Sequence, residues 1–240
     1  MAAYGARGRL DEMLRRLLMR RATVSACERI AERFHLVTLE GAALQGAAWT
    51  AGQKVQIAMA GPFVTRTYTP IEWDASAGRT RILCYAHGDG PGSAWVRDVR
   101  PGQDCDVFGP RRSIDPHPGS KPLAIFGDET SIGLAHALAA RSPPQSAACH
   151  FEAEDAEAAG EVLRRLRLPD AGLYVRRADD AHVEPMIAAA RSLAAAGAAF
   201  VLTGKAGTVQ RLRRALTQAE VPASLIDTKV YWAPGKAGLD

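Results

Sequence analysis

The chain has 240 residues, of which 47% are hydrophobic and 23% are charged. This balance is typical of a globular protein and argues against a disordered or fibrous chain. The formal charge of +4 comes from 30 basic and 26 acidic residues; these are interspersed and no aromatic stripe accompanies them, so we expect no nucleic-acid partner.

Residues 1–21 predict a short amphipathic helix with a basic face. Leucines and Met13 recur at helical spacing, and arginines occupy the other faces, the last of them Arg20 and Arg21. Such a helix packs on its own domain or on a dimer partner, or lies on a membrane surface; the alternative is a disordered segment. We expect a monomer or a homodimer.

Residues 22–115 predict an antiparallel β-barrel. Short segments rich in β-branched residues, among them 34–39, 54–59 and 80–85, are separated by glycine-containing turns. Strands at this spacing are typical of small barrels. One helix is expected at 94–99, because Gly90-Pro91-Gly92-Ser93 precedes it and a Pro-Gly pair follows it.

Residues 109–120 contain several prolines and glycines and no periodicity, which predicts a connection between two domains. From 120 to 240, short apolar runs alternate with helical patterns rich in Ala, Leu and Arg. We expect strands at 123–126, 147–152, 173–175, 199–202 and 224–231, and helices at 134–138, 156–166, after Pro185 and at 209–219. This alternation predicts a parallel sheet with helices on both faces, which binds ligands at the carboxyl ends of its strands.

Arg66-Thr67-Tyr68-Thr69 lies on a predicted barrel strand, where alternation sends Arg66 and Tyr68 to the same face. A guanidinium can clamp a pyrophosphate, a phenol ring can lie on an isoalloxazine, and a hydroxyl can reach a ring nitrogen. The alternative is an ordinary exposed strand.

Two further segments suit phosphate groups. Gly90-Pro91-Gly92-Ser93 opens a helix, whose first N–H groups and dipole attract an anion; the alternative is a plain turn capped by Ser93. Phe126-Gly127-Asp128-Glu129-Thr130 follows the first parallel strand, where a dinucleotide's phosphates normally lie, but it is not a G-x-G-x-x-G motif. Its two carboxylates would repel a phosphate unless they turn outward or cap the helix.

Together with His87-Gly88-Asp89, Gly109-Pro110-Arg111 and the terminal Tyr231-Trp232-Ala233-Pro234-Gly235, these segments resemble the siderophore-interacting protein family. These are the flavin-dependent ferric-siderophore reductases of the ferredoxin–NADP reductase superfamily. The resemblance covers nearly the whole chain from Ala22 onward. It implies an FAD-binding barrel domain at 22–115 and an NAD(P)H-binding α/β domain at 120–240.

The resemblance also implies roles for individual residues. Arg66 would hold the FAD phosphates, Tyr68 would stack on the flavin and Thr69 would hydrogen-bond near its N5, which makes Tyr68 and Thr69 the expected catalytic residues. The other expected cofactor-binding residues are His87, Gly90, Gly92 and Ser93 for FAD, and Gly127, Asp128, Glu129, Thr130, Thr203, Gly204 and Trp232 for the nicotinamide cofactor and the adjoining flavin pocket. His87 is alternatively a structural histidine.

Four cationic residues are candidates for attracting an anionic ferric siderophore: Lys205, Lys229, Lys236 and Arg111. Arg176-Arg177 is a candidate for the 2′-phosphate of NADPH. The chain departs from the family pattern at Pro70-Ile71, where relatives continue with arginine, and at Gly92 and Ala94, where they commonly carry alanine and arginine. It also has Lys205 where relatives tend to carry an acid.

The expected activity is electron transfer from NADPH or NADH through FAD to a ferric siderophore, in the cleft between the domains. Reduction releases Fe(II), because the softer, less highly charged ion is held less well by hard oxygen ligands. The alternatives are a flavin reductase or oxidase for a small organic acceptor, and a protein that binds flavin or a ferric chelate without turnover.

The cysteines and the termini bear on metals and location. Cys27, Cys84, Cys105 and Cys149 are too few for a disulfide scaffold and too scattered for a zinc or iron–sulfur site, so we expect no metal and an organic electron carrier. The N-terminus lacks the features of a signal peptide, and no apolar run approaches the ~20 residues of a membrane span. We therefore expect a cytoplasmic protein with reduced thiols.

Overall fold

The computed structural model describes residues 19–59, 64–117, 119–142 and 147–236. The chain divides into two compact units, which meet in the sequence between Ser113 and Ile114. Most of the helix predicted over 1–21 lies outside the described residues. Arg20 and Arg21, expected at its end, instead begin the first strand.

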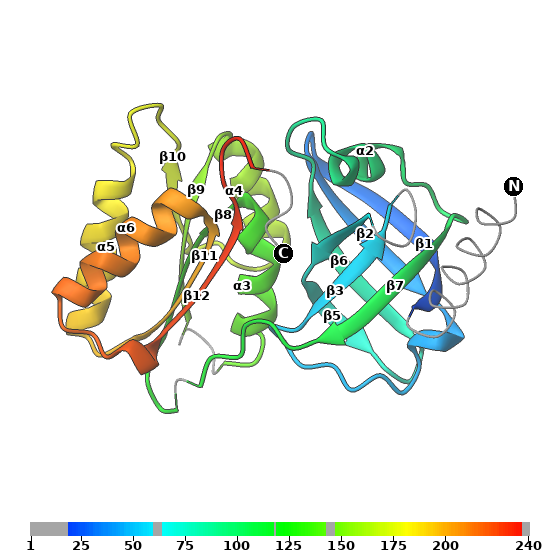
Figure 1. The fold of residues 1–240 in the computed structure, drawn as a ribbon, viewed down its shortest axis with the longest axis horizontal. Coiled ribbons are helices and arrows are strands. Elements are labelled where there is room, and N and C mark those ends of the chain that lie inside the picture. Colours follow the sequence, from blue (N-terminus) through cyan, green and yellow to red (C-terminus); the bar gives the residue numbers. More distant parts are fainter. Residues whose placement is uncertain (1–18, 60–63, 118, 143–146, 237–240) are drawn as a thin grey trace, which may run out of the picture. The chain divides into compact units, whose positions relative to one another are not determined.

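The N-terminal unit is a seven-stranded antiparallel sheet that curls around its own core (Figure 1). Its strand order is β4-β3-β7-β1-β2-β6-β5. The elements are β1 (Arg20–Ala31), β2 (Phe34–Glu40), the short 3-10 helix η1 (Ala42–Leu44), β3 (Lys54–Ala58), β4 (Thr65–Tyr68), β5 (Pro70–Asp74), β6 (Arg79–Tyr85), α2 (Pro91–Asp98) and β7 (Asp104–Arg111).

Side-chain alternation explains why these segments form half-buried strands. In β6, Thr80, Ile82 and Cys84 are fully buried while the residues between them are not. A period of two places one side of each strand in the core and leaves the other partly exposed. The strands predicted at 34–39, 54–59 and 80–85 and the helix predicted near 94–99 are confirmed.

One prediction about the connection between the units is wrong. Gly109, Pro110 and Arg111 were expected in that connection but form the end of β7. Strand β1 pairs with β7 only as far as Val107, and the end of β7 pairs with β3 on its other side. A proline is tolerated there because β1, which would need its N–H, no longer lies alongside.

The C-terminal unit is a five-stranded parallel sheet of order β10-β9-β8-β11-β12. The neighbouring strands are all parallel, as the alternating strand and helix pattern predicts. Its elements are β8 (Leu123–Asp128), η2 (Glu129–Ser131), α3 (Ile132–Ala139), β9 (Ala147–Ala153), α4 (Ala156–Arg165), β10 (Gly172–Val175), α5 (Val183–Ala195), β11 (Ala199–Lys205), α6 (Ala206–Gln218), η3 (Ala223–Leu225) and β12 (Ile226–Trp232).

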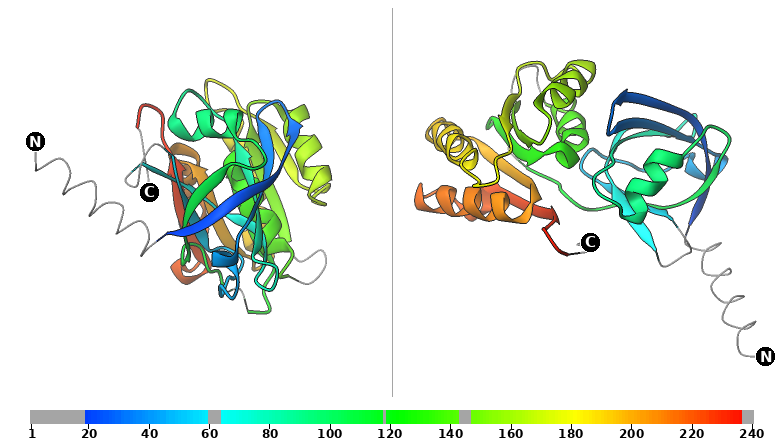
Figure 2. Two further views of the ribbon diagram at one scale, coloured as in Figure 1. Left: turned by 90° about the vertical axis from the view of Figure 1, so that its right-hand side faces the viewer. Right: turned by 90° about the horizontal axis from the view of Figure 1, so that it is seen from above.

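Helices cover both faces of this sheet. Helices α3 and α4 lie on one face, and α5 and α6 lie on the other (Figure 2). Phe126 and Phe200 of the central strands pack against Met186 of α5 and Leu212 of α6. All six residues of β8 are buried, as expected for a central strand covered on both faces. Every strand and helix predicted for this half of the chain is confirmed within a few residues.

The strand order places a change of direction between β8 and β11. From β8 the chain adds β9 and β10 on one side, and then returns to add β11 and β12 on the other. In open parallel sheets, ligands bind outside the carboxyl ends of the two strands at such a point. Here those ends carry Gly127 and Asp128 on β8, and Thr203, Gly204 and Lys205 on β11.

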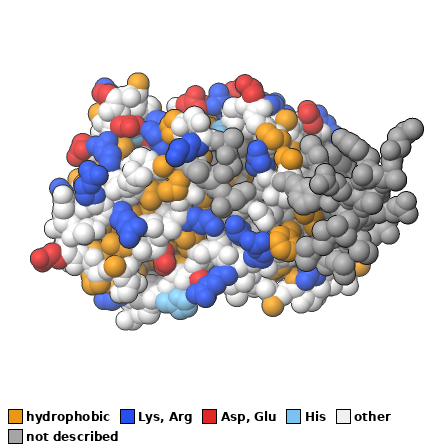
Figure 3. Space-filling model, in the orientation of Figure 1, with side chains coloured by type: hydrophobic (Ala, Val, Ile, Leu, Met, Phe, Trp, Pro, Cys, Tyr) orange, Lys and Arg blue, Asp and Glu red, His pale blue; other side chains and the backbone are white. Residues whose placement is uncertain are grey.

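Two surface properties bear on possible partners. Among the described residues, no helix is both long enough and apolar enough to span a lipid bilayer. On the face shown in Figure 3, the described Lys and Arg side chains are scattered over both units among neutral and hydrophobic ones.

Candidate functional site

Strand β4 and helix α2 come together in the N-terminal unit through Arg66, Tyr68 and Gly92. A Cβ placed on Gly92 would lie 3.0 Å from Arg66 Cγ and 3.5 Å from the Tyr68 hydroxyl. Both side chains therefore lie on the face of β4 that meets the first turn of α2, as strand alternation predicts. Residues 24 positions apart in the sequence form one local site.

The first turn of α2 keeps its backbone N–H groups available to an anion. Gly90 is the N-cap, Pro91 is the first helical residue, and the first helical hydrogen bond runs from the Ala94 N–H to the Gly90 carbonyl. The N–H groups of Gly92 and Ser93 precede that bond, in the part of a helix that has no intrahelical acceptor. The alternative in which Ser93 caps the helix is wrong.

Ser93 and His87 hold the loop in front of this helix. The buried Ser93 hydroxyl donates to the main-chain carbonyl of His87 at 2.5 Å. The His87 ring is exposed and stacks on Tyr85, with 6.0 Å between ring centroids. The side chain of Ser93 thus fixes the loop, which leaves its N–H as the group directed at an anion.

Tyr68 is partly buried and lies beside a second aromatic ring. Its centroid lies 5.9 Å from that of Trp95 of α2. Burial raises the pKa of the Tyr68 phenol well above its ordinary value, so this hydroxyl stays protonated at neutral pH. Thr69 follows β4 directly and is half-buried.

These residues suit the pyrophosphate and ring of a flavin nucleotide. The guanidinium of Arg66 supplies charge, the α2 turn supplies N–H groups, and Tyr68 supplies a flat ring. Gly92 leaves open the space beside Arg66 and Tyr68 that a side chain would fill. A Cβ on Gly90 would meet no atom within 4 Å, so the approach to the turn is open.

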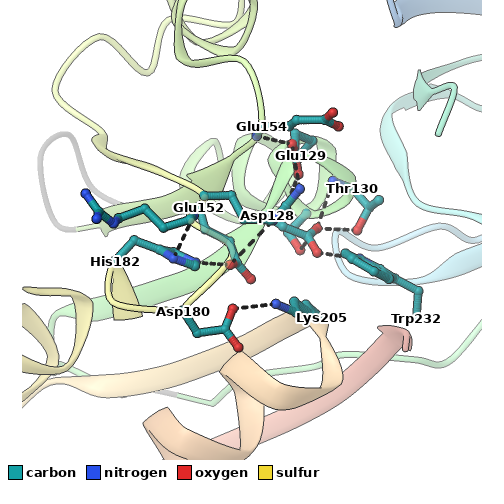
Figure 4. Close-up of polar contacts among 12 residues, drawn as sticks. Asp128, Glu129, Thr130, Glu152, Glu154, Asp180, His182, Lys205 and Trp232 are labelled. Atoms are coloured by element: carbon teal, nitrogen blue, oxygen red, sulfur yellow. Dashed lines mark hydrogen bonds and ion pairs between the residues drawn. The ribbon is translucent and has the colours of Figure 1, made fainter. Parts of the chain in front are cut away.

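Asp128 ends β8 at the strand-order change of the C-terminal unit and is completely buried. Its Oδ1 accepts hydrogen bonds from the Thr130 N–H at 2.9 Å and from the Thr130 hydroxyl, and its Oδ2 accepts from Trp232 Nε1 at 2.6 Å (Figure 4). Burial, together with the nearby carboxylates of Glu129 and Glu152, raises the pKa of Asp128 to about 6, against the lowering effect of those hydrogen bonds. The carboxylate caps η2 and does not point at a ligand.

Glu129 is also turned into the protein. Its carboxylate accepts from the Glu154 N–H at 2.7 Å and from two Arg176 nitrogens at 2.6 and 3.3 Å. Both carboxylates of the Asp128-Glu129 pair are therefore satisfied internally. The repulsion of a phosphate expected from the sequence is relieved because one carboxylate caps and the other forms an ion pair.

Glu152 and His182 extend this buried network. Glu152 ends the apolar run of β9, is fully buried and accepts from His182 Nε2 at 2.6 Å. The Arg177 N–H donates to His182 Nδ1 at 3.1 Å, so the ring carries its proton on Nε2. Arg176 Nε lies 3.6 Å from Glu152 Oε2. Within the described ranges, no three His, Cys, Asp or Glu side chains are arranged to hold a metal ion.

The Thr203-Gly204-Lys205 turn adjoins Asp128. Thr203 donates to the Ser131 hydroxyl at 2.9 Å. Gly204 has φ +97°, and a Cβ there would lie 2.5 Å from Asp128 Oδ2. Lys205 forms an ion pair with Asp180 at 2.7 Å, and its side chain is only 13% exposed. Its charge is therefore largely neutralised within the unit.

The other charged residues expected at the site are dispersed. Arg111 ends β7 with its guanidinium 4.7 Å above the Phe108 ring, Lys229 is a half-buried residue of β12, and Lys236 is exposed. Arg176 is committed to buried carboxylates, whereas Arg177 pairs with Asp179 on the surface.

Sequence reasoning did not single out Glu152, His182 or Asp180. Glu152 ends the parallel strand predicted at 147–152, and the rule that ligands bind at the carboxyl ends of such strands is the signal that could have marked it. Glu152, His182 and Asp180 pair with residues 25 or more positions away, and such pairs leave no pattern in the local sequence.

The comparisons with known proteins agree with this arrangement. Residues 61–114 match the model of the siderophore-interacting FAD-binding domain, and residues 121–235 match the model of the siderophore-interacting protein family. The search of curated proteins found no match.

Several solved structures share the two-domain fold. One is the siderophore-interacting protein SipS from Aeromonas hydrophila, at 22% identity and TM-score 0.76, covering 92% of this chain and 93% of that one. A siderophore utilization protein from T. fusca has 22% identity and TM-score 0.74, with 92% and 95% coverage. The ferredoxin reductase in carbazole 1,9a-dioxygenase has 16% identity and TM-score 0.74, with 89% and 69% coverage.

Proposed function

Because the chain belongs to the siderophore-interacting protein family, and its residues 61–114 match the siderophore-interacting FAD-binding domain, we propose that it is an NAD(P)H-dependent ferric-siderophore reductase. In this proposal residues 22–115 bind FAD, residues 120–240 bind NADPH or NADH, and the acceptor is an Fe(III) siderophore.

The observation that carries the proposal is the meeting of Arg66, Tyr68 and Gly92. A cation, an aromatic ring and a helix N-terminus lie within a few ångströms of one another, with a glycine where any side chain would intrude. This set provides the contacts that a pyrophosphate and a flat ring system need.

FAD bound there would supply the chemistry that the side chains lack, since it accepts two electrons at once from a nicotinamide and returns them one at a time. Arg66 and the N–H groups of Gly92 and Ser93 would neutralise the pyrophosphate. Tyr68, protonated and held beside Trp95, would orient the ring through its face, and Thr69 would offer a hydroxyl.

The C-terminal unit supports the nicotinamide part of the proposal by its strand order. The change of direction at β8 and β11 is the position at which open parallel sheets bind nucleotides. One NAD(P)H gives two electrons and releases one proton, so each NAD(P)H would reduce two Fe(III) chelates in succession. Lys229, Lys236 and Arg111 would attract an anionic chelate, and Lys205 less so because Asp180 neutralises it.

Absorbance spectroscopy tests the flavin and the electron donor. Purified protein should be yellow, and NADPH or NADH should bleach it under anaerobic conditions. Tyr68→Ala should weaken flavin retention and change its spectrum, while Tyr68→Phe, which keeps the ring, should retain both. An unaltered spectrum and flavin content in Tyr68→Ala would show that this ring does not contact the flavin.

Stopped-flow oxidation of the reduced protein tests the acceptor. Ferric siderophores should reoxidise it faster than they reoxidise free reduced flavin at the same concentration. If they do not, and a small organic acceptor does, the protein is a flavin reductase of another substrate class. A protein that binds flavin but is not reduced by either nicotinamide is a binding protein without turnover.

A further inference from the structure

Trp232 lies at the end of the last strand, beside the carboxyl ends of β8 and β11, and two contacts fix its indole. Its Nε1 donates to Asp128 Oδ2 at 2.6 Å. The guanidinium of Arg176 lies 5.6 Å from the ring centroid. The ring is half-buried, unlike the fully buried aromatic side chains of the sheet core.

The backbone aims this side chain. Gly204 pairs with Val230, but the next pair joins Lys205 to Trp232, so Tyr231 is an extra residue and β12 carries a bulge at this point. Because side chains alternate along a strand, an inserted residue sends the following side chain to the opposite face. The bulge therefore turns Trp232 to the side of the sheet edge on which Asp128 lies (Figure 4).

Asp128 is placed to receive the indole. Its Oδ1 is taken by Thr130, which leaves Oδ2 directed toward Trp232. Gly204 makes the room, since any Cβ there would collide with Oδ2. Burying a carboxylate without hydrogen-bond partners costs free energy. The partner of Asp128 Oδ2 is the indole N–H of Trp232, which lies 104 residues later in the sequence.

Arg176 lies over one face of the Trp232 ring and is itself held in place by an ion pair. The guanidinium forms an ion pair with Glu129 at 2.6 Å and lies 3.6 Å from Glu152, so the cation cannot swing away from the indole without leaving the buried Glu129 carboxylate without its cation. The indole is thus held at its N–H and at one face, at the position where this sheet order binds ligands.

We propose that Asp128 is a positioning residue that holds the Trp232 indole as a fixed aromatic wall of the nucleotide site, against which the flat base or nicotinamide of NAD(P)H binds. This inference rests on the proposed function. Asp128 and Trp232 act through one hydrogen bond, so removing the carboxylate and removing the indole N–H both release the ring from its position.

Calorimetric titration with NADP⁺ and NAD⁺, together with steady-state kinetics, tests the inference. Trp232→Phe keeps an aromatic ring but removes the N–H. Asp128→Asn replaces one of the two carboxylate oxygens by an NH2 group, so the side chain can no longer accept from both Thr130 and Trp232. Each should weaken dinucleotide binding and raise KM by about 10-fold while kcat changes much less, as expected for loss of a hydrogen bond to a charged group. The double variant should be no worse than the more affected single variant.

Trp73→Phe is the matched control, because the Trp73 indole N–H donates to the Leu44 carbonyl in the other unit. It should leave dinucleotide affinity unchanged.

The outcomes separate the two proposals. Wild-type protein that binds neither dinucleotide overturns the proposed function together with this inference. Wild-type protein that binds a dinucleotide, with both single variants within twofold of it or with effects that multiply in the double variant, overturns the positioning role alone.

Discussion

Replacement of Gly204 by alanine tests whether the turn after β11 is built around the Asp128 carboxylate. Gly204 has φ +97°, a conformation that L residues rarely adopt, and its missing side chain faces Asp128. The new Cβ would lie 2.5 Å from Oδ2 and 2.6 Å from Cγ, so the carboxylate would have to move. That movement breaks the hydrogen bond from Trp232, because Oδ2 is its acceptor.

The expected loss of unfolding free energy in Gly204→Ala has two parts. A non-glycine residue at positive φ costs about 1–2 kcal/mol. Loss of a hydrogen bond to a buried charged group adds about 1.5–3 kcal/mol. We therefore expect Gly204→Ala to lower the free energy of unfolding by about 2.5–5 kcal/mol, a large part of the stability of a domain of this size.

Gly197→Ala separates the two parts. Gly197 follows α5 with φ +78°, and a Cβ there would meet no atom within 4 Å. This variant therefore has the conformational cost of about 1–2 kcal/mol alone.

Urea unfolding followed by circular dichroism and by tryptophan emission would measure both variants against wild type. A Gly204→Ala variant no less stable than Gly197→Ala would refute the packing argument, and leave only backbone conformation as the reason for the glycine.

Three further predictions concern charge and space. Arg176→Met should cost about 3–5 kcal/mol in urea unfolding, because it leaves Glu129 buried without its cation; an unchanged midpoint would contradict this. The pKa of Asp128 is about 6 in the folded protein against an ordinary 3.8, so its contribution to stability is present at low pH and lost as the pH rises through 6. The unfolding free energy of wild type minus that of Asp128→Asn should accordingly fall by up to about 3 kcal/mol between pH 4 and 7.5, and a flat difference would show that Asp128 titrates normally. Gly92→Val should fill the space beside Arg66 and reduce the FAD retained on purification by about 10-fold or more (~1.4 kcal/mol per tenfold), with little change in unfolding; full retention would place the flavin elsewhere.

The fold was predictable from the sequence because its signals are local. Thr80, Ile82 and Cys84 alternate with less buried residues, and Leu123 to Phe126 form a continuous apolar run. A strand buried on one face shows alternating apolar residues, and a strand buried on both faces shows a continuous apolar run, so a few neighbouring residues are enough to predict either. The same local reasoning was wrong at the end of β7, where glycine and proline lie inside a strand. A strand tolerates a proline where no neighbouring strand needs its N–H, and the local sequence does not show which strands are neighbours.

The candidate site was predictable in composition but not in its contacts. Arg66, Tyr68 and Gly92 were expected near one another, and Gly92 lies against the side chains of the other two. The partners of the Asp128-Glu129 pair were not foreseen: the indole and the guanidinium that satisfy these carboxylates follow 104 and 47 residues later. Contacts over such separations depend on strand order and on a bulge in β12, which no local pattern specifies.

These contacts decide which of the cationic side chains at this edge of the sheet would be available to the dinucleotide of the proposed function. Arg176 forms an ion pair with the buried Glu129 at 2.6 Å, and releasing it would leave that carboxylate without its cation at a cost of several kcal/mol. Arg177 pairs with Asp179, and both side chains are more than 60% exposed, so exchanging that pair for another anion costs less than about 1 kcal/mol. Of the two arginines considered for the 2′-phosphate of NADPH, only Arg177 can change partner cheaply. Arg176 therefore neutralises the buried Glu129 carboxylate, and under the proposed function a preference for NADPH over NADH would depend on Arg177.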